Sequence, residues 1–235
     1  MNPVKRNIPN SITCINLLAG CMAIISASHA DAPMWGLPAY QWAFIFIAIG
    51  AVADFLDGFA ARALHAYSDL GKELDSLCDL VTFGVAPAII VFHLLSAEGI
   101  DPWAAWGALL IPVAGAIRLA RFNLDTRQAT TFIGLPIPAN AIFWIGFAAL
   151  FAQEGVTALS AWYWFLPILI VECWLMNSSF KMFSLKFKNL SLKDNYPRFL
   201  LVAAAIICCF TLGVAGLLWL IVFYVLMSLC MQDKA

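Results

Sequence analysis

The stretch 42-WAFIFIAIGAVADFLDGFAARALHAYSDLGKELDSLCD-79 decides the fold, because it joins an apolar run to a set of regularly spaced acids. Residues 42–56 are almost entirely apolar, which is typical of a helix that crosses the hydrocarbon core of a membrane. Ionisable groups in membrane segments are rare because their desolvation costs at least a few kcal/mol, so we interpret these acids as functional. They are Asp54, Asp57, Asp75 and Asp79.

The chain as a whole has the composition of an integral membrane protein. Of its 235 residues, 63% are hydrophobic and 11% are charged, whereas soluble domains are about 45–50% apolar and about 25% charged. Thirteen Lys and Arg against fourteen Asp and Glu leave a net charge of −1, which lacks the basic excess that a nucleic-acid partner requires. We therefore expect a single membrane domain, residues 1–235, and no nucleic-acid partner.

The apolar segments predict an all-α, polytopic membrane helix bundle with about eight transmembrane helices. A six-helix core is expected at about 9–177, and two further helices at about 198–231. The last two lie in one run, in which Gly213 and Gly216 bracket a tight turn; a single crossing is the alternative for this run. The expected segments are 12–28, 40–61, 74–95, 103–121, 135–152, 161–177, 198–212 and 215–231.

Charge placement predicts the orientation, because cytoplasmic connections collect Lys and Arg. All thirteen basic residues fall near the two termini or in the connections 62–72, 118–127 and 181–198, and the opposite connections carry acids alone. We therefore expect both termini and the active site to face the cytoplasm from an inner or plasma membrane. Residues 1–30 also have the layout of a cleavable signal peptide. We expect them to be retained, because a multispanning chain needs its first helix for packing.

The spacing of the four acids predicts a metal site. Asp54 and Asp57 are three residues apart and Asp75 and Asp79 are four apart, so each pair shares a helix face, and a short loop brings the two faces together. Carboxylates that converge in a low-dielectric setting repel one another unless protons or a cation neutralise them. All-oxygen ligation suits Mg²⁺ or Mn²⁺, and two such ions can clamp an in-line phosphoryl displacement. Solvated helix-end charges are the alternative.

Small residues and one arginine favour the metal site over that alternative. Gly58 and Ala61 leave almost no side chain beside the carboxylate face, so a phosphate-bearing ligand can approach the backbone closely. Arg62, one helical turn after Gly58, offers a fork for phosphate. The pattern predicts phosphoryl chemistry on a membrane-bound substrate.

Residues 54–79 resemble the CDP-alcohol phosphotransferase family, whose signature reads D-x-x-D-G-x-x-A-R, eight or nine residues, then G-x-x-x-D-x-x-x-D. The resemblance implies two Mg²⁺ or Mn²⁺ ions per site, with Asp54 and Asp75 bridging both, Asp57 on the first and Asp79 on the second. It also implies that Asp79 is the general base and that the protein is a homodimer. The residues expected to bind the CDP-linked lipid are Gly58, Ala61, Arg62, Ser68, Gly71 and Asn10.

Three further stretches, 9-PNSITCINLLAG-20, 118-RLARFN-123 and 132-FIGLPIPAN-140, are similar to those of the phosphatidylserine synthases within this family. That resemblance implies transfer of the phosphatidyl group from CDP-diacylglycerol to L-serine, with release of CMP. Glycerol 3-phosphate or an inositol phosphate as acceptor is the first alternative. An ion-coupled membrane transporter is the alternative from another class, disfavoured because the acids gather at one rim and no internal repeat is visible.

Several polar residues outside the signature have two interpretations each. Arg118 and Arg121 share a predicted helix face and are candidates for binding the acceptor carboxylate or the lipid phosphate, or are anchors at the cytoplasmic surface. Asn123 has the same ambiguity. Asn10 either contacts the nucleotide or caps the first helix ahead of Thr13.

Two later segments have structural interpretations. The prolines of 134-GLPIP-138 fit a rigid entry into the fifth helix. The basic loop with Lys181, Lys186, Lys188 and Lys193 is expected to attract anionic membrane lipids, and residues 181–198 are expected to form an interfacial helix.

Overall fold

The computed structural model describes residues 3–29, 32–97, 102–124, 132–154, 158–183 and 192–231. In these ranges the chain is a helix bundle with two short β-ribbons, which confirms the all-α class. Five helical runs are long and apolar enough to cross a membrane, so the chain is an integral membrane protein. They are Asn7–Ala27, Ala39–Ala63, Asp69–Ala97, Trp103–Leu124 and Asn195–Cys230.

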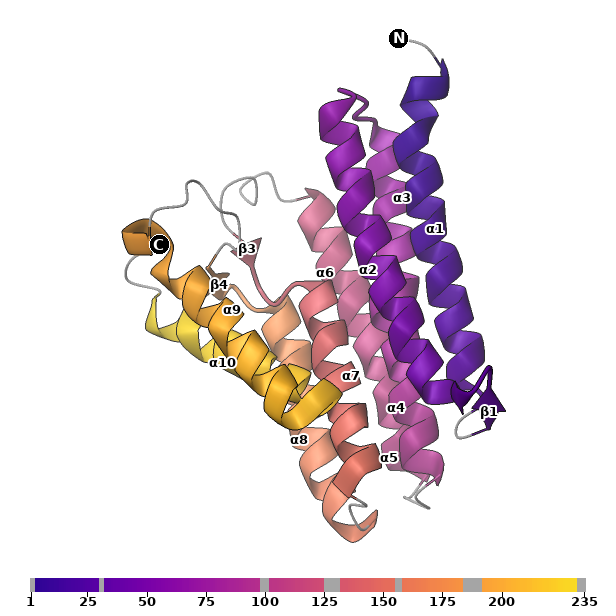
Figure 1. The fold of residues 1–235 in the computed structure, drawn as a ribbon, viewed down its shortest axis with the longest axis vertical. Coiled ribbons are helices and arrows are strands. Elements are labelled where there is room, and N and C mark those ends of the chain that lie inside the picture. The colour runs from indigo at the N-terminus through magenta and orange to yellow at the C-terminus, as the bar shows by residue number, and fades with distance from the viewer. Residues whose placement is uncertain are drawn as a thin grey trace.

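The first helices stand side by side along the long axis of the molecule (Figure 1). Helix α1 (Pro3–Ala27) is joined to α2 (Ala39–Ala63) by a ribbon of β1 (Pro33–Met34) and β2 (Leu37–Pro38). Helix α3 (Asp69–Asp79) continues through the π-helical segment η1 (Leu80–Val85) into α4 (Ala86–Ala97). The chain then returns through α5 (Pro102–Trp106), the 3₁₀ turn η2 (Gly107–Leu109) and α6 (Leu110–Leu124).

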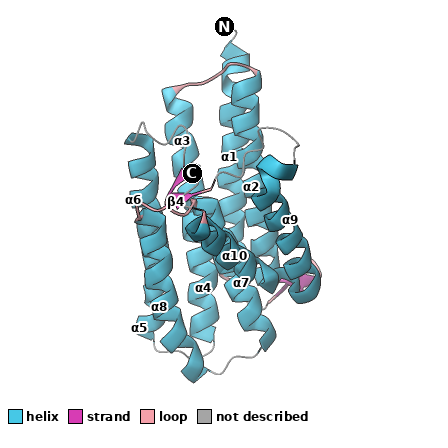
Figure 2. Ribbon diagram, turned by 90° about the vertical axis from the view of Figure 1, so that its left-hand side faces the viewer, coloured by secondary structure: helices cyan, strands magenta, loops and turns pink. Residues whose placement is uncertain are grey.

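The later helices are arranged differently. Helices α7 (Ile137–Glu154) and α8 (Ala158–Asn177) are flanked by a ribbon in which β3 (Phe132–Ile133) pairs with β4 (Lys181–Met182). Helix α9 (Leu192–Leu212), the turn η4 (Gly213–Ala215) and α10 (Gly216–Cys230) form a hairpin. This hairpin runs diagonally to the other helices in Figure 1, and α10 crosses in front of α7 in Figure 2.

The turn at Gly213 confirms that residues 199–231 form two helices, because Gly213 has a positive φ of 59° that favours glycine. That both helices cross the membrane stays a prediction, as do the total of eight crossings and the cytoplasmic termini. The expected interfacial helix at 181–198 is wrong in the described part. Lys181 and Met182 pair with β3 instead, and residues 192–198 are the first turns of α9.

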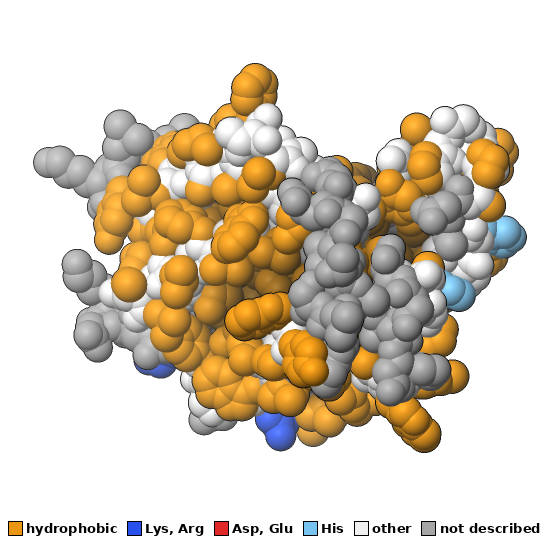
Figure 3. All heavy atoms as spheres, turned by 90° about the horizontal axis from the view of Figure 1, so that it is seen from below, with side chains coloured by type: hydrophobic (Ala, Val, Ile, Leu, Met, Phe, Trp, Pro, Cys, Tyr) orange, Lys and Arg blue, Asp and Glu red, His pale blue; other side chains and the backbone are white. Residues whose placement is uncertain are grey.

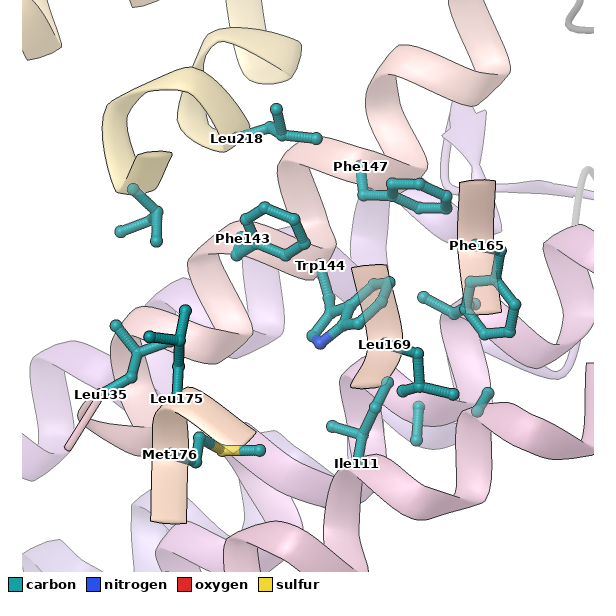
Figure 4. Packing of buried hydrophobic residues seen from close by; sticks show 14 of the residues in the cluster. Ile111, Leu135, Phe143, Trp144, Phe147, Phe165, Leu169, Leu175, Met176 and Leu218 are labelled. Atoms are coloured by element: carbon teal, nitrogen blue, oxygen red, sulfur yellow. The ribbon is translucent and has the colours of Figure 1, made fainter. Parts of the chain in front are cut away.

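The core has two parts with different packing. The larger lies between α4, α5, α6, α7, α8 and α10 around the fully buried Trp144 (Figure 4). The indole N–H of Trp144 donates to Asn140 Oδ1 at 2.9 Å. The smaller joins α1, α2, η1, α4 and α7 through small and aliphatic side chains. Seen from the end opposite the acids, the described side chains are mainly hydrophobic (Figure 3).

The predicted role of the prolines in 134–138 is confirmed. Pro138 is in the first turn of α7, and Pro136 directly precedes it. Gly134, at a φ of 74°, donates its N–H to Phe180 O at 2.7 Å, and Leu135 N–H donates to Leu175 O at 3.0 Å. The entry to α7 is therefore fixed against the end of α8.

Candidate active site

Helices α2 and α3 bring three of the four predicted acids together. One carboxylate oxygen from each of Asp54, Asp57 and Asp75 lies within 4.8 Å of the others. Asp57 Oδ2 and Asp75 Oδ1 are buried and have no hydrogen-bond partner among the described residues. Buried oxygens without a partner are unfavourable, and carboxylates without His or Cys are the donor set of a hard divalent cation. The cluster is therefore compatible with a divalent metal ion.

Asp79 lies one helical turn beyond Asp75, at the end of α3, and only 8% of it is exposed. It is not part of the group of three, although Asp54 and Asp75 are close enough to act on it electrostatically. Its Oδ1 accepts a hydrogen bond of 3.1 Å from Asn16 Nδ2 on α1. Asp79 is therefore held at the edge of the cluster by a side chain from another helix.

Asn16 is a site residue that the sequence signature does not include. It is fully buried, and its backbone carbonyl accepts a hydrogen bond of 2.9 Å from Thr82 Oγ1 in η1. Asp79 and Thr82 thus both bind Asn16, one at each end of the junction between α3 and η1. A π-helical segment beside a functional residue is a common arrangement. The two hydrogen bonds to Asn16 therefore fix the direction in which the Asp79 carboxylate points.

Glycines allow this close approach of three helices. A Cβ atom on Gly50 would lie 2.5 Å from Thr82 Cγ2 and 2.9 Å from Asn16 Oδ1. A Cβ atom on Gly20 would lie 2.9 Å from Thr82 Cα. Any side chain at either position would push α1, α2 and η1 apart.

Three of the residues predicted to bind the CDP-linked lipid converge at the start of α3. Ser68 Oγ accepts a hydrogen bond of 3.0 Å from Gly71 N–H and so caps the helix. A Cβ atom on Gly71 would lie 3.0 Å from Asn10 Oδ1. The alternative that Asn10 caps α1 is wrong, because α1 begins at Pro3 and Asn10 lies inside it. Proline suits the first turn of a helix, which explains the early start.

Gly58, Ala61 and Arg62 lie near the end of α2, beyond the acids on that helix. A Cβ atom on Gly58 would lie 3.6 Å from Arg62 Nη1, so the guanidinium group lies along the glycine. Arg62 is exposed, whereas Asp57 is buried. This end of α2 therefore offers a guanidinium group, and a stretch of backbone that no side chain covers at Gly58, beside the acids. Both features suit a bound phosphate.

Arg118 and Arg121, three residues apart on α6, have different environments. Arg118 is 8% exposed, and its guanidinium carbon lies 5.5 Å from the centre of the Phe122 ring. Arg121 is exposed and donates from Nη1 to Asn177 O at 3.0 Å, at the end of α8. The neighbouring helices therefore cover Arg118 and leave Arg121 at the surface.

Asn123 connects α6 to α3. Its Nδ2 donates to Ser76 Oγ at 3.0 Å, and its carbonyl accepts a hydrogen bond of 2.7 Å from Lys72 Nζ. Of the three residues predicted for the acceptor pocket, only Arg118 is buried. Arg121 and Asn123 instead form hydrogen bonds that join α6 to α8 and to α3.

The family model described as CDP-alcohol phosphatidyltransferase matches residues 6–175. The chain belongs to the CDP-alcohol phosphatidyltransferase family. The match includes α1, both helices that carry the acids, and Arg118 on α6. It ends before β4, α9 and α10, so the diagonal hairpin lies outside the part that the family model describes.

Three relatives from different organisms share one enzyme name. A CDP-diacylglycerol–serine O-phosphatidyltransferase of Mycobacterium leprae is 34% identical over 232 residues, which cover 94% of this chain and 71% of that protein. One of Bacillus subtilis is 41% identical over 135 residues, covering 56% of this chain and 69% of that protein. One of Methanocaldococcus jannaschii is 36% identical over 154 residues, covering 66% of each.

Proposed function

We propose that this chain transfers the phosphatidyl group of CDP-diacylglycerol to L-serine, giving phosphatidylserine and CMP. The observation that carries the proposal is the carboxylate cluster of Asp54, Asp57 and Asp75, with Asp79 at its edge, in a chain that is 34% identical to a serine O-phosphatidyltransferase over nearly its full length. A lipid-embedded enzyme is also what the substrate demands, because CDP-diacylglycerol does not leave the membrane.

Asp79 is the proposed general base. The serine hydroxyl attacks the phosphorus that bears the diacylglycerol, the bond from this phosphorus to the CMP oxygen breaks, and the hydroxyl proton passes to Asp79. An alcohol has a high pKa and needs a base within hydrogen-bond reach, which supports this role. The hydrogen bond from Asn16 leaves the second oxygen of the Asp79 carboxylate available for the acceptor.

Asp54, Asp57, Asp75 and Asp79 are the residues proposed to hold the metal, so that Asp79 would serve both as a ligand and as the base. When bound, Mg²⁺ or Mn²⁺ would neutralise the pyrophosphate and make CMP a good leaving group. The unpartnered oxygens of Asp57 and Asp75 support ligation by these two residues. The absence of His and Cys from the cluster supports a hard cation rather than zinc.

The proposed lipid substrate lies along Gly58, Ala61 and Arg62, with its nucleotide end toward Ser68, Gly71 and Asn10. The convergence of the last three residues at the start of α3 supports this direction. The basic residues around this rim support a cytoplasmic site. The homodimer stays a prediction.

Serine is the proposed acceptor because it is small and zwitterionic, and the buried Arg118 offers a single cation for its carboxylate. Glycerol 3-phosphate or an inositol phosphate carries a dianion and would call for more than one cation. Arg121 is held by the end of α8, which supports serine over these acceptors.

Turnover of purified protein with CDP-diacylglycerol and Mn²⁺ or Mg²⁺ tests the proposal, with labelled serine, glycerol 3-phosphate and inositol 1-phosphate offered separately. We expect CMP release and labelled phosphatidylserine with serine alone, and none after chelation of the metal. Release of CMP with glycerol 3-phosphate but not with serine would overturn the choice of acceptor.

A further inference from the structure

Helix α3 carries two of the four acids but has little apolar packing to hold it in place. Its buried residues are Cys78 and Asp79, both at its end, whereas Leu70 and Leu77 are 69% and 63% exposed. A helix is fixed in rotation about its own axis mainly by burial of an apolar stripe. Other contacts must therefore set the directions of Asp75 and Asp79.

The carboxylate cluster tolerates little rotation of α3. Asp75 contributes one of the three oxygens that lie within 4.8 Å of one another. Side-chain ends lie about 5–6 Å from a helix axis, so a rotation of about 10° would move a carboxylate oxygen by about 1 Å. Metal–ligand distances vary by only about 0.2 Å. A small turn of α3 would therefore take Asp75 out of ligand position.

Asn123, near the end of α6, contacts the side of α3 next to Asp75. Its Nδ2 donates to Ser76 Oγ at 3.0 Å and to Glu73 Oε2 at 3.4 Å. Its carbonyl accepts a hydrogen bond of 2.7 Å from Lys72 Nζ; α6 ends one residue later, so this carbonyl has no partner within its own helix. Because Lys72 and Ser76 are four residues apart, these contacts hold one side of α3 over a full turn.

The end of α6 is itself bonded to α8. Arg121 Nη1 donates to Asn177 O at 3.0 Å, and Asn177 Nδ2 donates to Ala114 O at 3.0 Å. These two bonds run in opposite directions between the same two helices. Asn123 therefore connects α3 to a pair of helices that are already joined to each other.

We infer that Asn123 is a positioning residue for the metal centre, because it sets the rotation of α3 and with it the direction of Asp75. This inference rests on the proposed function, in which Asp75 is a metal ligand. Adjacent helix residues lie about 100° apart, so a bond at Ser76 holds the helix and leaves the Asp75 carboxylate free for the ion. An acceptor carboxylate would need a donor from Asn123, and both hydrogens of its amide have acceptors on α3.

Titration of Mn²⁺ into the purified full-length protein, followed by the EPR signal of the free ion, tests the inference through Asn123→Ala. Without the amide, a smaller fraction of molecules has α3 in the rotation that aligns Asp75, and the apparent dissociation constant rises accordingly. We expect a rise of roughly tenfold from the loss of these hydrogen bonds. Turnover should recover at saturating Mn²⁺, with KM for serine within about twofold of the wild-type value. Unchanged Mn²⁺ affinity with a raised KM for serine would give Asn123 the acceptor role and overturn the inference.

Ser76→Ala reaches the same contact from α3. It should also weaken Mn²⁺ binding, and the double variant with Asn123→Ala should bind no more weakly than Asn123→Ala alone. Ser28→Ala is the matched control, because Ser28 is exposed and donates to the carbonyl four residues earlier, as Ser76 does. Its Mn²⁺ affinity should equal that of the wild type.

Additive effects of Asn123→Ala and Ser76→Ala would overturn the inference, while Mn²⁺ binding by the wild type still upheld the proposed metal ligands. A wild type that binds no Mn²⁺ would overturn both.

Discussion

The two halves of the bundle are packed in opposite ways. Helices α1, α2 and η1 meet through glycine and small side chains, so that Asn16, Thr82 and Asp79 touch across helix boundaries. Helices α7 and α8 meet through large rings, with Trp144, Phe143 and Phe147 on α7 and Phe165 facing Trp144 from α8. In the first half the close contacts join polar groups, whereas large apolar rings fill the contact between α7 and α8.

The difference has a physical cause. A carboxylate buried in a membrane helix needs partners within hydrogen-bond reach, and only small residues let a second and third helix come that close. Aromatic side chains keep helices apart but bury much apolar area. The first half is therefore suited to holding a site, and the second half to stabilising the bundle around it.

Removing the proposed base from the first half is expected to have the largest effect. Asp79→Asn keeps the size of the side chain and its contact with Asn16 but cannot accept the serine proton. CMP release should fall by at least about 100-fold, while binding of CDP-diacylglycerol, measured with a labelled lipid, should persist. Asp69→Asn, the same change at an exposed acid on α3, is the control and should retain activity. Substantial turnover by Asp79→Asn would remove Asp79 from the base role.

Disturbing the close packing of the first half should have an intermediate effect. In Gly50→Ala the new methyl group meets Thr82 and Asn16, and overpacking of this kind costs about 1–3 kcal/mol. We expect a lower melting temperature in detergent and a severalfold drop in turnover, because Asn16 can no longer hold Asp79 in place.

Gly107→Ala is the matched control for Gly50→Ala, since its added Cβ would lie 3.4 Å from its nearest neighbours, an ordinary contact. It should leave both measurements nearly unchanged. Equal behaviour of the two alanine variants would show that the close approach at Gly50 does not matter for Asp79.

A change in the aromatic half should have the smallest effect on turnover. Trp144→Phe removes the indole N–H that binds Asn140 Oδ1 and leaves that buried amide without its partner. We expect a loss of about 1–3 kcal/mol in stability, read as a lower melting temperature. Turnover per folded molecule should stay within about twofold. A large fall in turnover without a change in melting temperature would contradict the division between the halves.

The sequence predicted the helical class and most of the acidic site, because the evidence for both is local. The apolar runs and the spacing of Asp54, Asp57, Asp75 and Asp79 are visible without a structure. The separate position of Asp79, and the opposite environments of Arg118 and Arg121, depend on how α3 and α6 are rotated in the bundle. No spacing rule fixes such a rotation.

Asn16 required the structure for a different reason. Asn16 is 63 residues from Asp79 in sequence, although Asn10, Thr13 and Asn16, three apart in an apolar helix, form a polar face that could have been found.

The central claim is that the carboxylates at this rim form a metal centre, and titration of Mn²⁺ into purified protein, followed by the EPR signal of the free ion, tests it most directly. The account predicts two bound ions per chain in the wild type and weakened or lost binding in Asp54→Asn, with Asp69→Asn unchanged. Absence of Mn²⁺ binding to the wild type, or an identical titration for Asp54→Asn, would contradict it.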